Sequence, residues 1–125
     1  MEKTVKIGDK DVRMRASALI PRMYRFKFGR DLISDMRQLQ KSFLAVQKSK
    51  LSKEEQQDAE FSVLDLTIFE NVAWLMCRDA DNSIPDSPED WLDSIDGVFS
   101  IYSVLPSILE LWADSNMTTS EPRKK

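Results

Sequence analysis

The chain has 125 residues, a formal net charge of −3, 42% hydrophobic residues and 31% charged residues. This composition is typical of one globular domain and excludes a disordered chain. With no histidine, one cysteine and three scattered glycines, the sequence excludes a histidine-containing catalytic triad, a thiolate zinc site and a glycine-rich phosphate loop. An enzyme could rely only on carboxylates or lysine. We therefore expect a non-enzymatic binding or assembly protein, without catalytic residues, cofactor or metal.

The sequence contains neither a membrane span nor a secretion signal that we can identify. Its longest strictly apolar run, Val72–Cys77, is far shorter than the roughly 20 residues that a span needs. No apolar signal region follows the charged first residues. We expect a soluble intracellular protein without a membrane partner.

The N-terminal residues predict a β-hairpin over about residues 3–16. Apolar residues alternate with charged ones on both sides of a Gly-Asp turn, as in two short strands: Val5, Ile7, Val12, Met14 and Ala16. Because an isolated hairpin is marginally stable in water, its apolar face must dock on the rest of the domain.

Pro21 predicts the start of a first helix and Gly29 predicts its end. Tyr24, Phe26 and Phe28 alternate with basic residues, as they would in a strand. The four-residue spacing between Tyr24 and Phe28 instead places both on one helical face, and we interpret this segment as a helix.

Two longer helices are predicted next. Along the first of them, apolar residues recur at steps of four and three: Leu32, Met36, Leu39, Phe43 and Val46. The second is predicted to start at Ser52, which would form a capping box with Glu55, and to include Phe61. Toward Met76 it becomes apolar nearly all round, so we expect it to be the central, most buried helix.

The last third is predicted to contain a loop over residues 79–88 and two more helices. The first begins at Pro88 behind a serine cap and ends near Ile95. The other runs over about residues 98–115 and is kinked or interrupted at Pro106.

Residues 117–125 are polar and have no apolar period, so we expect a flexible C-terminal tail. The globular domain would then span residues 1–116, with its helices between about 21 and 115. The predicted fold class is mainly α, a single helical domain with a short N-terminal β-hairpin.

Charge is divided unevenly along the chain. Residues 1–53 contain 14 Lys and Arg against 5 Asp and Glu, a balance of +9, whereas residues 54–125 contain 4 against 16, a balance of −12. Either the two halves pack together and complement each other, or the charged faces steer partners or self-association.

The aromatic residues of the predicted helices are the candidates for partner binding. Most should lie in the core, yet those on basic or acidic helices could contact a partner: Tyr24, Phe28, Trp91, Tyr102 and Trp112. Arginines and aromatics interleave between Arg22 and Arg30, as in single-strand nucleic-acid binders. An amphipathic helix explains the same pattern, and a pI near 5.0 argues against a nucleic-acid partner.

Two further features have ordinary structural explanations. Cys77 lies on the most apolar helix, where a small buried hydrophobe is expected rather than a reactive thiol. Aspartates and glutamates between Asp79 and Asp93 lack the central glycine and terminal glutamate spacing of a calcium loop. We expect them to be solvated loop and capping carboxylates.

Stretches along nearly the whole chain resemble, in order, the tail assembly chaperones of long-tailed phages and prophages of Firmicutes. The N-terminal hairpin carries the first likeness, and the others follow at Pro21–Arg25, Phe28–Leu32, Ile68–Trp74, Ile84–Leu92, Phe99–Tyr102 and Ile108–Trp112. The resemblance implies a non-enzymatic protein of the host cell cytoplasm that coats the tape measure protein, helps recruit tail tube subunits, and is absent from the mature virion. It supplies no binding residues.

Two other functions remain open from the sequence: a small nucleic-acid-binding phage regulator, or a structural tail or head-completion component kept in the virion. The resemblance also implies that a longer product could arise by ribosomal frameshifting near Lys124-Lys125, whose codons can form an adenine-rich slippery run. A plain solubilising terminus is the alternative.

Overall fold

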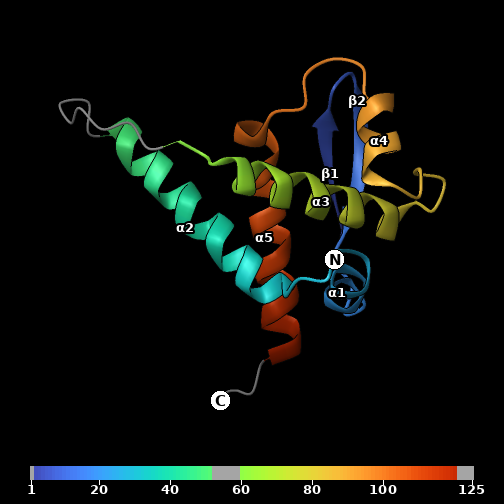
Figure 1. The fold of residues 1–125 in the computed structure, drawn as a ribbon, viewed down its shortest axis with the longest axis horizontal. Helices are drawn as coiled ribbons and strands as arrows, with labels where there is room; N and C mark the ends of the chain where they lie inside the picture. Colours follow the sequence, from blue (N-terminus) through green and yellow to red (C-terminus); the bar gives the residue numbers. More distant parts are fainter. Residues whose placement is uncertain (1, 52–59, 121–125) are drawn as a thin grey trace.

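The computed structural model describes residues 2–51 and 60–120 of the chain (Figure 1). It is mainly helical with a two-stranded antiparallel hairpin, which confirms the predicted fold class. The elements, in chain order, are β1 (Glu2–Ile7), β2 (Lys10–Arg15), α1 (Ile20–Phe28), α2 (Leu32–Leu51), α3 (Val63–Ala80), α4 (Pro88–Ser94) and α5 (Ile101–Ser120).

The hairpin docks through one face, as expected. β1 and β2 pair with Val5 opposite Val12, and the apolar side chains of Val5, Ile7 and Met14 are buried. β2 packs against α3 and β1 packs against α5, and α3 crosses the hairpin in Figure 1. This helical cover supplies the apolar partner that two strands alone lack.

The hairpin turn is fixed by the segment between α4 and α5. Gly8 N donates to Val98 O at 2.9 Å, and Asp9 N donates to Asp96 O at 2.9 Å. Gly8 has a φ of 62°, and a Cβ on it would lie 2.1 Å from Asp96 O. Only glycine therefore permits both this backbone conformation and this close approach.

The segment around Tyr24 is a helix rather than a strand. α1 buries Ile20 and Tyr24 on one face and ends at Gly29, whose φ of 68° is left-handed and whose N–H donates to Arg25 O. α2 follows and buries most of its predicted stripe. Both helices pack against α3.

α3 is the central helix, as predicted, and every residue of Val72–Cys77 is buried. Its predicted start was wrong, because α3 begins at Val63 and Phe61 precedes it. Ser62 Oγ accepts a hydrogen bond from Asp65 N, and Asp65 Oδ2 accepts one from Ser62 N. This capping box provides acceptors for free backbone N–H groups at the N-terminus of α3. The box predicted at Ser52 lies outside the described residues.

α4 matches the prediction, with Ser87 Oγ accepting from Asp90 N at its start and Ile95 at its end. α5 begins at Ile101 rather than near Val98, because the Val98 carbonyl is engaged by the hairpin turn. No interruption occurs at Pro106, since buried Val104 and other core residues hold the helix on both sides of it.

The C-terminal boundary also differs from the prediction. α5 continues to Ser120, so residues 117–120 of the expected tail belong to a helix. The rest of that predicted tail, residues 121–125, lies outside the described residues, as does the proposed frameshift position.

Candidate partner-binding surfaces

The five aromatic candidates occupy different environments. Tyr24 and Trp91 are only 0% and 3% exposed, so their assignment to a partner surface is corrected: they belong to the core. Trp91 packs its ring edge on Phe99 at 5.3 Å between centroids. Phe28 is half-buried and contacts the rings of Tyr24 and Trp74. The sequence pattern could not distinguish these buried residues from exposed ones, because the exposure of each side chain depends on what packs against its helix.

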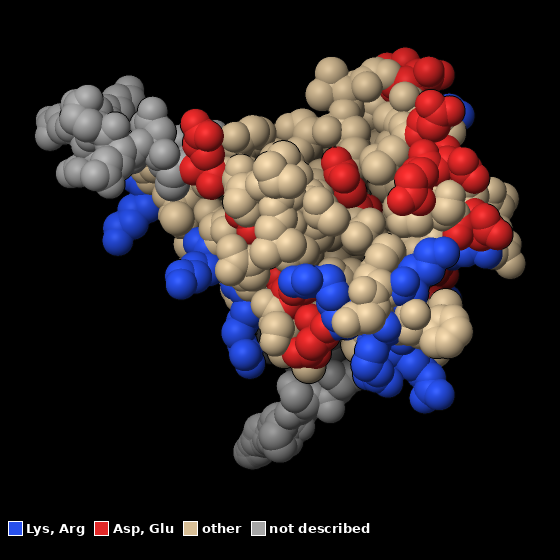
Figure 2. All heavy atoms as spheres, in the orientation of Figure 1, with Lys and Arg blue, Asp and Glu red and all other residues tan. Residues whose placement is uncertain are grey.

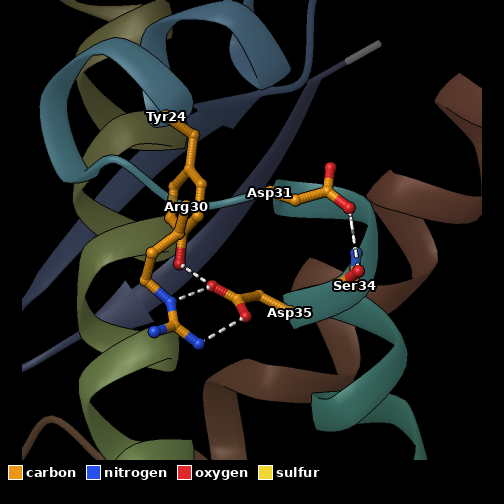
Figure 3. A network of polar contacts seen from close by, with 5 residues as sticks. All are labelled: Tyr24, Arg30, Asp31, Ser34 and Asp35. Carbon is orange, nitrogen blue, oxygen red and sulfur yellow. Dashed lines mark hydrogen bonds and ion pairs between the residues drawn. The ribbon is translucent and has the colours of Figure 1, made fainter.

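Tyr24 belongs to a polar network that joins α1 to α2 (Figure 3). The Tyr24 hydroxyl donates to Asp35 Oδ2 at 2.6 Å. The Arg30 guanidinium donates to both oxygens of the same carboxylate, from Nε at 2.7 Å and from Nη2 at 2.9 Å. Asp31 separately accepts from the hydroxyl of Ser34 in the first turn of α2. The buried Asp35 carboxylate thus accepts from one donor on α1, Tyr24, and from one in the turn between the helices, Arg30.

Electrostatics keep this network in a single protonation state near neutral pH. Burial of the Asp35 carboxyl by itself raises its pKa, but the hydrogen bonds from Arg30 and Tyr24 outweigh burial and hold that pKa below its usual value. Burial, followed by the hydrogen bond to Asp35, raises the pKa of Tyr24 well above its ordinary value. The hydroxyl is therefore a constant donor, and the network fixes the position of α1.

Asp35 was not among the residues predicted from the sequence. It lies three residues after Leu32 and four before Leu39, so an ionisable side chain interrupts the apolar face of α2. A buried charge requires partners, and this position was the available signal that a polar network exists there.

A partly exposed apolar stripe runs along α5. Steps of four, three and four place its members on one helical face: Tyr102, Pro106, Leu109 and Ala113. Tyr102 is 55% exposed, Pro106 and Ala113 are exposed, and Leu109 is half-buried. We call these four residues the α5 stripe. The half-buried Trp112 lies beside Leu109 on the same helix.

The N-terminal end of the α5 stripe contacts the segment just before α3. The rings of Tyr102 and Phe61 contact edge to face, with centroids 5.5 Å apart. Leu64, in the first turn of α3, is also exposed. Two of the five candidates, Tyr102 and Trp112, therefore lie on or beside a surface that a partner could cover.

Charge remains separated on the folded molecule. Figure 2 shows Lys and Arg along α2 and over α1, whereas Asp and Glu gather toward α4. Among the described residues two ion pairs join the halves, from Lys3 to Glu110 at 2.7 Å and from Arg15 to Asp79 at 4.0 Å. Both of these pairs are made by the hairpin, and the described basic side chains of α1 and α2 face solvent.

Cys77 has the predicted structural role, and Asp81 is a loop carboxylate as predicted. Asp79 is not a solvated loop carboxylate, because it lies in α3, its side chain is 16% exposed and it contacts the hairpin. Cys77 is buried, and burial raises the pKa of its thiol to about 12. Asp79 accepts from Ser17 N at 3.1 Å, and Asp81 accepts from the hydroxyl of Ser83 at 2.7 Å. Across the ranges 2–51 and 60–120, no group of three or more Cys, Asp or Glu is arranged to hold a metal ion.

The helices in the described part of the chain are too short or too polar to cross a membrane.

Comparisons with known proteins identify no relative of this chain. No protein-family model, curated protein or solved structure matches the chain.

Proposed function

We propose that this protein is a tail assembly chaperone of a long-tailed phage or prophage, which binds the tape measure protein and helps recruit tail tube subunits. The ordered likeness of the sequence to that family, from the hairpin to Trp112, supports the proposal. The protein would act in the host cell cytoplasm and be absent from the mature virion.

The α5 stripe is the observation that carries the proposal furthest. A tape measure chain is long and helical and exposes apolar stripes until the tail tube encloses it. Tyr102 and Leu109 of the stripe offer apolar area over about two helical turns, the span that an amphipathic client helix covers with residues at i, i+3 or i+4, and i+7. One such contact is weak, but many copies along one client bind with avidity and can still be displaced.

The geometry of α1 gives less support to a nucleic-acid regulator. Of the residues that suggested it, Tyr24 is fully buried and Arg30 is paired with Asp35. Stacking on bases requires accessible rings. Packing within the domain thus explains Tyr24, Phe28 and Arg30, whereas Phe26 and the cations around it remain exposed.

Co-expression with the tape measure protein tests the proposal. We expect the client to be soluble with this protein and to aggregate without it. Ala113→Glu, which places a charge in the α5 stripe, should abolish the rescue. Ser103→Glu is the matched control, since it adds the same charge to an exposed position of α5 outside the stripe. Equal client insolubility with and without the wild-type protein would refute the proposal.

Mass spectrometry of purified virions separates a chaperone from a structural component. We expect tail tube and tape measure peptides without peptides of this protein. Its persistence in the particle at a fixed copy number would favour the structural alternative.

A further inference from the structure

α1 has a second apolar face, directed away from the core. Ile20 and Tyr24 lie on its buried face, whereas Leu19, just before the helix, and Met23 and Phe26 follow one another at steps of four and three on the other side. Their exposed fractions are 51%, 41% and 86%. Single exposed hydrophobic residues are ordinary, but three on one helical face make a continuous apolar surface.

The charged residues of α1 itself are all basic. Arg22, Arg25 and Lys27 of α1 are exposed, and the helix contains no acidic residue. Figure 2 shows Lys and Arg gathered over α1. Lys27 Nζ lies 5.7 Å from the ring centroid of Trp74 in α3. We call Leu19, Met23 and Phe26 with these three cations the outer α1 face.

The outer α1 face is held in place before any partner arrives. The Tyr24–Asp35–Arg30 network ties α1 to α2 (Figure 3), and α1 also packs on α3. Ile20 and Tyr24 make these contacts from the opposite side of the helix, and Lys27 at the edge of the outer α1 face contacts Trp74 of α3. Binding therefore requires little reorganisation of the described chain, which lowers its entropic cost.

We propose that the outer α1 face is a docking site for an acidic amphipathic helix of a partner protein. The apolar residues span about two helical turns, roughly 10 Å at 1.5 Å per residue. A partner helix with apolar residues at i, i+4 and i+7 would cover them, and Asp or Glu beside those positions would meet Arg22, Arg25 and Lys27. This site is separate from the α5 stripe and does not depend on the client proposed for it.

Fluorescence anisotropy with synthetic helices tests the proposal. The probe is a labelled peptide of about 18 residues, long enough for five helical turns, with leucines on one face and glutamates on the other. A second peptide carries lysine at each glutamate position, and a third has the first composition in scrambled order. We expect the glutamate helix to bind at least about tenfold more tightly than either of the others, as charge and register require.

Variants localise the binding. Phe26→Ser should weaken the glutamate helix at least about tenfold, as loss of a central aromatic contact does. Arg22→Glu with Arg25→Glu should have a similar effect and remove most of the salt dependence. Leu44→Ser and Lys48→Glu, at exposed positions of α2, are matched controls that should bind like the wild type. Because Phe26 is 86% exposed, its variant should keep the melting temperature of the wild type.

Four results would overturn the proposal. They are equal binding of the three peptides, unchanged affinity after Phe26→Ser, binding of single-stranded DNA or phosphatidylserine vesicles without binding of the glutamate helix, and a dimer in sedimentation that Phe26→Ser dissociates. The last two would assign the face to an anionic polymer or membrane, or to a second copy of the chain.

Discussion

Replacing Asp35 with alanine should destabilise the domain far more than replacing an exposed surface carboxylate would. The Asp35 side chain is buried and accepts from Tyr24 at 2.6 Å and from Arg30 at 2.7 Å and 2.9 Å. Its removal leaves the hydroxyl of the fully buried Tyr24 without an acceptor. α1 would then lose the side-chain hydrogen bond from Tyr24 that joins it to α2.

The two partners contribute unequally to the expected cost. A hydrogen bond from a buried hydroxyl to a carboxylate contributes about 1.5–3 kcal/mol, because the donor cannot exchange it for water. The Arg30 side chain is 46% exposed, so solvent screens its ion pair and limits it to about 1 kcal/mol. Alanine is the better helix former, which offsets part of the lost interaction between Asp35 and the helix dipole. We expect Asp35→Ala to lower the free energy of unfolding by about 2–4 kcal/mol.

A double-mutant cycle measured by urea unfolding checks this account. Tyr24→Phe alone should cost about 0.5–1.5 kcal/mol, because Asp35 keeps its bonds to Arg30. With phenylalanine at position 24, Asp35→Ala should cost about 1–2 kcal/mol less than it does in the wild type. Asp86→Ala, at an exposed loop position, is the control and should change stability by less than about 0.5 kcal/mol. Additive effects of the two network variants would refute the reasoning.

Three further predictions concern other parts of the structure. Gly8→Ala should lower the free energy of unfolding by at least about 2 kcal/mol and by more than Gly29→Ala does, because both add left-handed strain of about 1 kcal/mol but only the Gly8 Cβ meets a backbone oxygen, that of Asp96. Equal decreases in stability for the two variants in thermal unfolding would contradict this. The folded pKa of Asp35 lies below the unfolded value of about 4, so its stabilisation of the fold is complete above about pH 4 and is lost as the pH falls through the folded pKa. The difference in unfolding free energy between wild type and Asp35→Asn should therefore shrink on acidification, and a constant difference would count against this account. Native Cys77 should react with a thiol reagent at pH 8 at least about a hundredfold more slowly than in denaturant, because the thiol is buried and its pKa is about 12; labelling at the unfolded rate would show an open core.

The local sequence was sufficient for most of the secondary structure. The hairpin, the end of α1 at Gly29, the α2 stripe and the start of α4 at Pro88 were all predicted correctly. Each depends on a period of two or of three to four residues, or on a turn or cap whose partners lie within a few positions. Such signals act before the rest of the chain is in place.

Two helix starts differ from the prediction. α3 begins at Val63 behind a local capping box of Ser62 and Asp65, and a further hydrogen bond from Gln38 of α2 to Asp65, at 3.2 Å, joins this cap to a distant part of the chain. α5 begins after Val98, because the hairpin turn, about ninety residues away in the chain, takes the Val98 carbonyl. A sequence window around α5 contains no sign of its distant partner, whereas the spacing of Ser62 and Asp65 at the start of α3 lies within the local sequence.

Burial of the candidate residues was likewise beyond the sequence. Tyr24 and Phe26 are two residues apart on one short helix, yet one is fully buried and the other is 86% exposed. Their opposite faces follow from the helical period, but only the packing of α2 and α3 over one side determines which face is the core. The sequence alone therefore defined an amphipathic pattern of aromatics and cations, and the tertiary structure decided which of them remain available to a partner, because exposure depends on everything that packs against a side chain.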